Sequence, residues 1–304
     1  MKKYKPYLGR VDLVKNQVKR ERIQEQEAAK KRKRSIQEQN KQRHLRYQEQ
    51  LRSELAARYF HGVVSAGGES FSNTYSVALD GTDDYVNVAD NSNLSFGDSV
   101  NDSPFSLSAW VKISNFNSAH IIFEKRDYIN NNNNFEYVLA ITSAGGINNN
   151  IYDNNVLNRR GRKTSDGLIS LNTWYHIAMT YSGVGGTNAS AGIKTYLNGV
   201  RVDNADNQKN IYTAMHNTNQ PFNIGRILAG NIDEASVFNI ELSSTEVTNI
   251  YNSGVPNDLS SYSSLVSWWR FEEGSGSTAT DSGSGGNDGT LISDATFEED
   301  TPGS

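Results

Sequence analysis

The stretch that decides the fold is residues 172–200, NTWYHIAMTYSGVGGTNASAGIKTYLNGV. Within it, Trp174–Tyr181 and Ile193–Leu197 are runs of alternating apolar character that flank a loop rich in Gly, Ser and Asn. The second run ends in Asn198-Gly199, a dipeptide that tolerates the positive φ angles of a tight hairpin turn. The stretch therefore predicts an antiparallel β-meander.

The two faces of the first predicted strand differ in polarity. Successive side chains point to opposite faces of a strand. One face carries Tyr175, Ile177, Met179 and Tyr181, and the other carries Trp174, His176, Ala178 and Thr180. The first of these faces is apolar enough to lie in a core.

Similar short runs recur along the chain from residue 77 onward. We predict strands at residues 77–79, 85–88, 105–113, 121–124, 135–141, 221–225, 230–238 and 265–271, with weaker ones at 151–152, 168–171 and 290–292. The basic run NRRGRK, residues 158–163, is predicted to be an exposed loop. A capping pattern at residues 243–246 predicts one short surface helix. Closely spaced strands with a single helix near the end are typical of a β-sandwich.

Residues 1–62 differ in charge from the rest of the chain. They hold 18 Lys and Arg against 7 Asp and Glu, a net charge of +11, so the whole-chain charge of −4 leaves −15 on residues 63–304. Residues 11–60 contain no Gly or Pro, and are mostly Lys, Arg, Glu, Gln and Ala, which favour helix. We predict a long basic α-helix over residues 1–62 and a small, polar linker over residues 63–73.

The predicted helix has two interpretations. It is either a solvated stalk or an anchor, whose basic surface lies on an acidic partner while its apolar ends dock. Nucleic acid is the weaker choice of partner, because Tyr4, Tyr7 and Tyr47 are not interleaved with the basic run as a stacking platform requires. A homo-oligomer such as a trimeric fibre is an open alternative, although the helix lacks the sustained heptad that would specify one.

Cysteine content and hydropathy bear on the compartment. The chain has no cysteine, which fits a reducing cytosol but is also common among exported bacterial proteins. The basic start, MKKYKPYLGR, is not followed by the apolar segment of a signal peptide, and no run of 18 apolar residues occurs. We therefore expect neither export by the usual route nor a membrane span.

Six motifs stand in one order along the chain. They are ALDGTDDYV at residues 78–86, FSLSAWVK at 105–112, the meander at 174–199, and FNIGR, GNIDEASVF and LSSTEV within 222–247. Together they resemble the laminin G-like, concanavalin A-like lectin/glucanase jelly-roll family over residues 74–292. The resemblance implies an all-β fold, a two-sheet antiparallel jelly-roll sandwich, preceded here by the basic helix.

One segment departs from the family pattern. The run from Trp269 to Leu291 usually stands before the ALDG strand, whereas in this chain it comes last. It is either permuted, so that it supplies a missing sheet edge, or the start of a truncated second repeat. We favour the first, because a lone strand would leave Trp268, Trp269 and Phe271 exposed. Residues 265–271 are therefore predicted to complete the sheet, and residues 293–304 to form a flexible tail.

The resemblance also raises the question of catalysis, since the same superfold includes glycoside hydrolases. Those enzymes need two carboxylates on one strand, as in E-x-D-x-x-E. The matching strand here keeps Asp233 but has Asn231 and Ser236 in place of the two glutamates. We therefore predict a non-enzymatic protein in which Asp233 and Glu234 tie the strand to neighbouring turns.

Two kinds of binding site remain as candidates. Calcium prefers several oxygen ligands in one place, and Asp80, Asp83, Asp84 and Asp233 are candidate ligands; the alternative is an acidic turn without metal. The second kind is a carbohydrate site, in which aromatic side chains stack on sugar rings. The candidates are Tyr128, Tyr152 and Trp269, and the alternative is that these rings belong to the core.

These observations favour a structural protein of a virion. A lectin-like sandwich faces the exterior, yet this chain shows no export signal and carries a basic helix. A phage capsid or tail appendage resolves this conflict, because it is made in the host cytoplasm and meets the exterior only when the particle is released. Residues 1–62 would anchor it to capsid, portal or tail proteins, and residues 74–292 would be displayed for adhesion to a glycan. The alternative is an extracellular or cell-surface bacterial protein that binds carbohydrate, and a glycoside hydrolase is the third choice.

Overall fold

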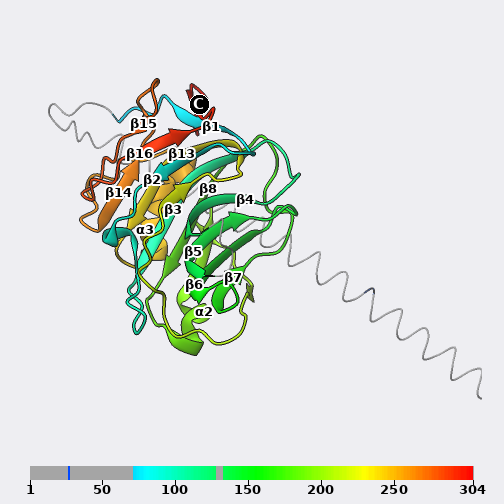
Figure 1. Ribbon diagram of the computed structural model, residues 1–304. Helices are drawn as coiled ribbons and strands as arrows, with labels where there is room; N and C mark the ends of the chain where they lie inside the picture. The colour runs from blue at the N-terminus through cyan, green and yellow to red at the C-terminus, as the bar shows by residue number, and fades with distance from the viewer. Residues whose placement is uncertain (1–26, 28–70, 128–132, 304) are drawn as a thin grey trace, which may run out of the picture. The chain divides into compact units, whose positions relative to one another are not determined.

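A computed structural model of the protein describes residues 71–127 and 133–303, together with Glu27. The chain divides into two compact units, Met1–Glu69 and Ser70–Ser304. The predicted basic helix over residues 1–62 and most of the predicted linker lie outside the described residues. The second unit, called the β domain below, is a sandwich of two antiparallel sheets (Figure 1), which confirms the predicted all-β fold.

The first sheet, sheet A, is built around the long central strands β3 and β13. Its order is β10-β9-β8-β3-β13-β1-β17, and β14 also pairs with β13. The bounds are β10 Val200–Arg201, β9 Ile193–Leu197, β8 Trp174–Tyr181, β3 Phe105–Ile113, β13 Ala229–Phe238, β1 Ser76–Asp80, β17 Thr296–Glu298 and β14 Leu265–Trp269. The predicted meander is therefore present as β8, β9 and β10.

The second sheet, sheet B, has the order β11-β7-β6-β5-β4-β12-β2-β16-β15. The bounds are β11 Ala205–Asp206, β7 Arg159–Lys163, β6 Ile147–Asn155, β5 Asn133–Ile141, β4 His120–Arg126, β12 Phe222–Ile224, β2 Tyr85–Val88, β16 Gly289–Ile292 and β15 Thr278–Ala279. Every pairing in this sheet is antiparallel. Strands far apart in sequence, such as β2 and β12, are thus neighbours.

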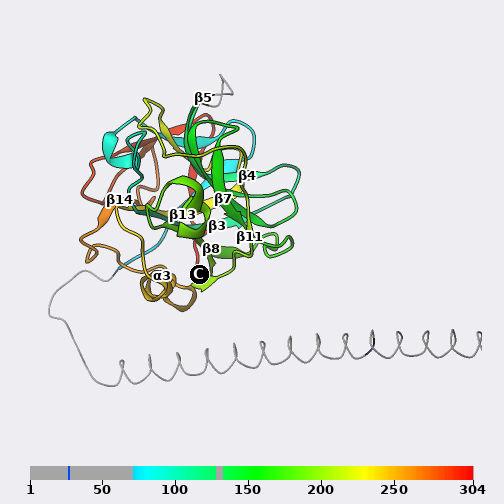
Figure 2. The ribbon, with the colours of Figure 1, turned by 90° about the horizontal axis from the view of Figure 1, so that it is seen from below.

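The helical segments described in the β domain are short. They are η1 Ser92–Leu94, η2 Gly186–Asn188, α2 Ala189–Gly192, α3 Ser244–Tyr251 and η3 Asn252–Gly254. Helix α3 begins with the predicted capping box, formed by Ser243 and Glu246. Its buried Val247 and Ile250 belong to a cluster with Trp268 on the outside of sheet A (Figure 2). One side of the sandwich is therefore covered by α3.

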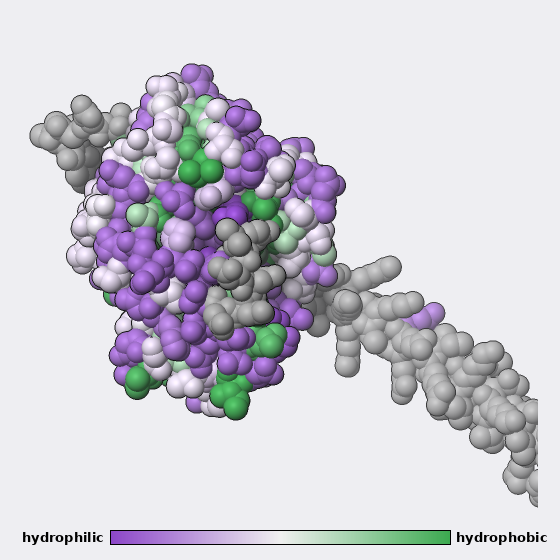
Figure 3. Space-filling view, in the orientation of Figure 1, coloured by the Kyte–Doolittle hydropathy of each residue, from purple (hydrophilic) through white to green (hydrophobic). Residues whose placement is uncertain are grey.

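The main core lies between the two sheets. Ile177, Met179 and Tyr181 of β8 are fully buried there, as their alternation predicts, together with Tyr137 and Leu139 of β5. Burial of one such side chain contributes about 1.5–3 kcal/mol. The surface in Figure 3 is mostly hydrophilic, with small separate hydrophobic patches. Most apolar side chains of the strands thus lie in the core.

The C-terminal part of the chain belongs to the sandwich. Strand β14 pairs with β13, which places Trp269 opposite Ala235, so the aromatic segment completes sheet A of its own chain. The prediction of a flexible tail over residues 293–304 is wrong. Strand β17 pairs with β1, with Phe297 opposite Val77, and Phe297 packs against the main core. Backbone pairing and this apolar ring order the tail.

The basic run at residues 158–163 also differs from its prediction. It forms β7 in place of an exposed loop, and Arg160 is 6% exposed. The guanidinium group of Arg160 donates to the carbonyl oxygens of Arg159 and Asn210, while Arg162 is paired with Asp203. These partners allow a run of arginines to be part of a sheet. The weak strand predicted at residues 168–171 does not form.

Candidate functional site

A row of polar side chains crosses the outer face of sheet B. Each residue in the series Thr290, Asn87, Asn223 and Glu124 lies opposite the next on the neighbouring strand. Residues opposite each other share a face of the sheet, whereas a neighbour along the strand, such as Val86, points into the core. Asn87 Nδ2 donates to Asn223 Oδ1 at 2.9 Å, and Asn223 Nδ2 donates to Glu124 Oε1 at 3.4 Å. The row ends at the carboxylate of Glu124.

The carboxylate of Glu124 is fully buried and holds two arginines. Arg126 Nε donates to Glu124 Oε2 at 2.6 Å, and Arg226 Nε lies 3.6 Å from Glu124 Oε1. A buried carboxylate needs such partners, because leaving it uncompensated costs several kcal/mol, about 3–5 in typical cases. Glu124 therefore fixes where both guanidinium groups lie.

Arg226 in turn covers an aromatic ring. Its guanidinium carbon lies 4.7 Å from the ring centre of Tyr85, the first residue of β2, which is a cation–π distance. The two side chains belong to a pocket of 270 Å³, called the Tyr85 pocket below. It is lined by Thr82, Asp83, Tyr85, Arg226, Ile227, Ile292 and Ser293. A half-buried ring, apolar walls and four polar side chains thus share one small space.

The acidic turn between β1 and β2 forms one rim of this pocket. Carboxylate oxygens of Asp80, Asp83 and Asp84 lie within 4.8 Å of one another. Asp84 is 2% exposed, and its two oxygens accept from the backbone N–H groups of Asp80 at 3.0 Å and Asp294 at 2.9 Å. Burial raises the pKa of Asp84. Asp84 therefore fastens the turn, while Asp80 and Asp83 face solvent.

The predicted calcium ligands are only partly brought together. Asp80, Asp83 and Asp84 form one cluster, and their oxygens are of the kind that a hard cation prefers. In the pairing of β1 with β13, Asp80 lies opposite Ala229 at one end and Val77 lies opposite Ile232 at the other. Asp233 follows Ile232, so it lies at the far end of this pairing from the three aspartates. Asp233 is therefore no fourth ligand. Calcium binding stays a prediction for the three aspartates of the turn.

Asp233 and Glu234 form a separate acidic pair at a bulge in β13. Asp233 Oδ2 accepts from Asn73 Nδ2 at 2.9 Å, and Glu234 Oε2 accepts from Trp268 Nε1 at 2.5 Å. Arg270 Nε lies 3.7 Å from Glu234 Oε1. Because the pair is buried, the pKa of Asp233 is well above its usual range and that of Glu234 rises to about 8. These contacts join β13 to β14 and to the segment before β1.

The stability of the β domain is expected to fall as pH rises toward about 8. A carboxyl whose pKa is raised by folding binds its proton more tightly when folded, so its contribution is complete below the ordinary pKa of 4.5 and is lost as pH passes the folded value of about 8. One such proton changes the unfolding free energy by ~1.4 kcal/mol per pH unit at most. Urea unfolding at several pH values measures this slope.

The matched variants for this experiment are Glu234→Gln and Glu241→Gln. Glutamine keeps an acceptor for Trp268 but has no proton to lose, so Glu234→Gln is expected to reduce the slope above pH 6.5, where His176, whose pKa burial lowers to about 3, no longer contributes. Asp233, whose pKa is also raised by burial, accounts for slope that remains. Glu241 is part of a partly exposed ion pair with Lys194, and its variant is expected to keep the slope. An unchanged slope in Glu234→Gln would contradict the assignment.

The predicted sugar-stacking residues are mostly unsuited to that role. Trp269 is fully buried, its ring stacks on Phe222 at 5.6 Å, and its Nε1 donates to the carbonyl oxygen of Asn287. Tyr152 is 5% exposed and packs against Phe135. For both residues the stacking prediction is wrong, because no ring face is free for a ligand. Tyr128 lies outside the described residues.

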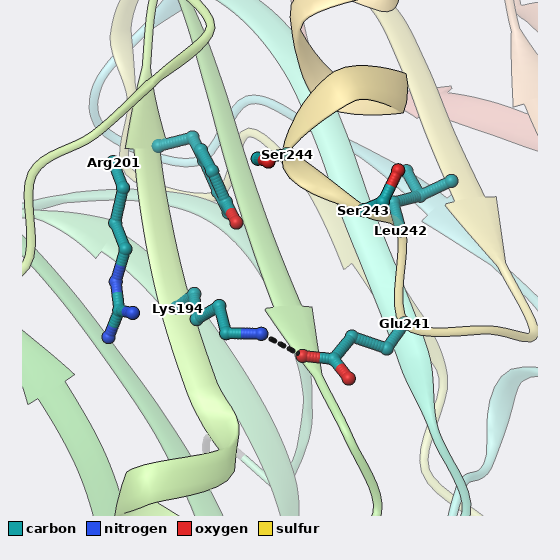
Figure 4. A pocket seen from close by; sticks show the side chains of 7 residues that line it. Lys194, Arg201, Glu241, Leu242, Ser243 and Ser244 are labelled. Carbon is teal, nitrogen blue, oxygen red and sulfur yellow. Dashed lines mark hydrogen bonds and ion pairs between the residues drawn. The ribbon is translucent and has the colours of Figure 1, made fainter.

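A second pocket, with a volume of 490 Å³, lies beside α3 (Figure 4). It is lined by Lys194, Tyr196, Arg201 and residues 241–244. Lys194 Nζ donates to Glu241 Oε1 across it at 2.5 Å (Figure 4), and Arg201 is paired with Asp203. The two cations of this pocket thus already have carboxylate partners. Arg226 of the Tyr85 pocket is paired as well, but that pocket combines the exposed carboxylate of Asp83 with a half-buried ring, whereas Tyr196 of the second pocket is 2% exposed, so the Tyr85 pocket is the better candidate for ligand binding.

Of the residues that line the Tyr85 pocket, reasoning from the sequence singled out Asp83, as a candidate calcium ligand, but neither Tyr85 nor Arg226. Tyr85 is the Tyr of the motif ALDGTDDYV, and Arg226 is the Arg of FNIGR. The two motifs are far apart in the chain and come together because β2 pairs with β12, with Val86 opposite Ile224. That pairing was not predicted, although the polar end of each motif was a usable signal.

The sandwich of two antiparallel sheets with one covering helix defines a class, the lectin-like β-sandwiches. The family model described as the concanavalin A-like lectin/glucanases superfamily matches residues 80–248, more than half of the chain. The chain therefore belongs to this superfamily. Among proteins with curated functions, none matches this sequence.

Several solved structures align with this chain. A Bacteroides ovatus protein to which carbohydrate binding is ascribed has 18% identity and a TM-score of 0.54. The alignment covers 77% of this chain and 62% of that protein, so this chain spans less than two thirds of its length. The CBM40 domain of a Ruminococcus gnavus sialidase, bound to α2,3-sialyllactose, has 12% identity and a TM-score of 0.40, covering 60% of this chain and 99% of that one. A pentraxin from Limulus polyphemus has 16% identity and a TM-score of 0.33, covering 57% and 84%.

At 18% identity and a TM-score of 0.54, the similarity to the Bacteroides ovatus protein shows a shared fold and nothing more. Within the part of the chain that the structure describes, no helix has the length and hydropathy needed to cross a membrane.

Proposed function

We propose that the β domain binds glycans without transforming them, and that the Tyr85 pocket is its binding site. Protein sites for sugars combine an aromatic ring, which packs on the C–H face of the sugar, with a few fixed hydrogen-bonding groups. The pocket offers the ring of Tyr85, the hydroxyls of Thr82 and Ser293, and the carboxylate of Asp83.

The observation that carries this proposal is the way in which Arg226 is held. Its guanidinium group lies between the buried carboxylate of Glu124, at 3.6 Å, and the ring of Tyr85, at 4.7 Å. A donor held in place loses less freedom when a ligand binds, which favours affinity. Preorganised polar groups beside a half-buried ring are the features expected of a binding site.

Two further observations support a binding role over a catalytic one. The strand that carries two glutamates in hydrolases of this superfold has Asn231 and Ser236 at those positions. The remaining acids, Asp233 and Glu234, are buried and accept hydrogen bonds from Asn73 and Trp268. The fold shared with the Bacteroides ovatus protein is consistent with carbohydrate binding.

For the whole protein we propose a structural component of a virion. In this proposal residues 1–62 anchor the chain to capsid, portal or tail proteins, and the β domain meets the glycan. The net charge of +11 on residues 1–62 against −15 on the remainder supports two parts with different partners. The alternative is a bacterial surface or secreted protein that binds carbohydrate. Mass spectrometry of purified particles tests the first: absence of this chain from them contradicts it.

Glycan binding is expected to depend on the ring of Tyr85. Tyr85→Ala removes the stacking surface and the partner of Arg226, and is expected to weaken binding about tenfold or more, which corresponds to ~1.4 kcal/mol. Tyr85→Phe keeps the ring and is expected to stay close to wild type. A glycan array with the full chain identifies ligands, and calorimetry then gives the affinities.

The matched control is Ile211→Ser. Ile211 is 76% exposed and lies in the loop between β11 and β12, away from the Tyr85 pocket. This variant is expected to bind as the wild type does. Equal affinities of Tyr85→Ala and wild type for every ligand on the array would place the binding site elsewhere.

A further inference from the structure

We propose that the Tyr85 pocket selects amino sugars, meaning glycans with a free, protonated amine, over acidic glycans. This inference rests on the proposed function and adds the class of ligand. It follows from the pocket's shape and from the balance of charge around it.

The balance of charge at the pocket is negative. Asp83 lines the pocket and clusters with Asp80 and Asp84, whereas Arg226, the guanidinium group that lines the pocket, shares the carboxylate of Glu124 with Arg126. Both guanidinium groups are paired with Glu124, at 2.6 and 3.6 Å. The positive charge of the arginines is thus balanced by the buried carboxylate of Glu124. The charges on the exposed rim are those of the aspartates.

The aspartates of the rim act on one another. Burial is the largest cause of the raised pKa of Asp84, and the charges of Asp80 and Asp83 raise it further. Mutual repulsion of this kind is relieved when a cation arrives, since an opposite charge within about 4–6 Å favours the ionised form. The rim therefore attracts positive groups and repels carboxylates or sulfates.

The lining of the pocket tells what kind of cation fits. Tyr85, Ile227 and Ile292 give apolar walls, and Thr82 and Ser293 give hydroxyls. Ser293 Oγ donates to Asp83 Oδ2 at 3.1 Å, so Asp83 keeps acceptor capacity for a ligand. A bare metal ion uses neither the ring nor the apolar walls. A sugar ring with an ammonium group uses the aromatic ring, the apolar walls and the carboxylate of Asp83.

The size of the pocket agrees with a ligand of one or two sugar residues. Its volume of 270 Å³ lies just below the roughly 300–1,000 Å³ that is typical of small-molecule pockets. In this arrangement the sugar packs on Tyr85 and its ammonium group donates to Asp83. The hydroxyl group of Thr82 is left to contact a hydroxyl group of the same sugar.

The test compares three sets of oligosaccharides by calorimetry with the full chain. They are glucosamine oligomers, N-acetylglucosamine oligomers and galacturonic acid oligomers of equal length. At about pH 6 most amines and carboxylates are ionised. Glucosamine oligomers are expected to bind about tenfold more tightly than the acetylated ones, and the acidic ones most weakly. Added salt is expected to reduce this preference, because rim charges are partly exposed.

The variant Asp83→Asn separates charge from shape. It keeps the size of the side chain and is expected to remove most of the preference for the amine while leaving binding of the acetylated oligomers unchanged. The control is Asp98→Asn, an exposed aspartate in the loop after β2, at the far end of that strand from Tyr85. It is expected to keep the full preference.

The outcomes distinguish this inference from the proposed function. If acetylated or acidic oligomers bind as tightly as the amine and Tyr85→Ala abolishes their binding, the selectivity is wrong and the glycan site stands. If the preference persists in Asp83→Asn, its cause lies elsewhere and the inference is overturned. If no glycan binds to the wild type, both proposals fail together.

Discussion

Replacing Lys125 by methionine is expected to destabilise the β domain by about 3–5 kcal/mol. Lys125 is fully buried, and its Nζ lies 2.7 Å from Asp90 Oδ1 and 2.9 Å from Glu136 Oε1. It also donates to the carbonyl oxygens of Thr218 and Gln220. Methionine fills the space but leaves Glu136, which is fully buried, without a cation. Urea unfolding of the purified chain measures the loss.

Two comparisons make this expectation specific. Lys194→Met removes a partly exposed ion pair with Glu241 and is expected to cost less than about 1 kcal/mol. The double variant Lys125→Met with Glu136→Gln removes the uncompensated charge and is expected to regain part of the lost stability. A cost for Lys125→Met no larger than that for Lys194→Met would show that the buried cation is dispensable.

Replacing Trp269 by alanine is expected to cost about 3–5 kcal/mol as well, through the cavity that the lost ring leaves. Trp269 has no exposed surface, stacks on Phe222 across the core, and donates from Nε1 to the carbonyl oxygen of Asn287 at 2.8 Å. The experiment tests whether the C-terminal aromatic strand belongs to the sandwich in solution. Thermal unfolding followed by circular dichroism is a suitable measurement.

The matched control is Trp174→Ala. Trp174 is half-buried at the start of β8, and its Nε1 donates to Asp300 Oδ1 at 3.0 Å. Its loss is expected to cost about 1 kcal/mol, the value of one partly exposed hydrogen bond. If both variants lose the same small amount, then the strand that carries Trp269 is peripheral and the truncated-repeat interpretation regains its place.

The fold could be predicted from the sequence where the alternation of apolar residues is regular. The face of β8 that holds Ile177 and Met179 is the core face, as the alternation predicts. The sequence does not predict β7, because a run of arginines is normally exposed. Nothing in the local sequence shows that Asp203 and Asp206 lie close enough to pair with Arg162. Nor does the sequence predict β17, because a strand of three residues is too short to show alternation of apolar and polar side chains.

The candidate site was less predictable than the fold. The alternation tells that Trp268 and Trp269 point in opposite directions, but both faces of β14 are covered, one by the main core and one by the cluster around α3. No ring on this strand is therefore free. The Tyr85 pocket needs the pairing of β2 with β12 and the buried Glu124, and these depend on contacts that span many residues of the chain.

The pairings of β1 have a consequence for synthesis. This strand lies near the start of the β domain, yet its two partners are β13 and β17, more than a hundred residues later. A ribosome that has made residues 71–228 has therefore released a strand with no neighbour, and folding of such distant contacts is slow. The sandwich closes only after β17 has left the ribosome, so chains that lack β17 expose an unpaired edge of β1 and are candidates for aggregation or chaperone capture.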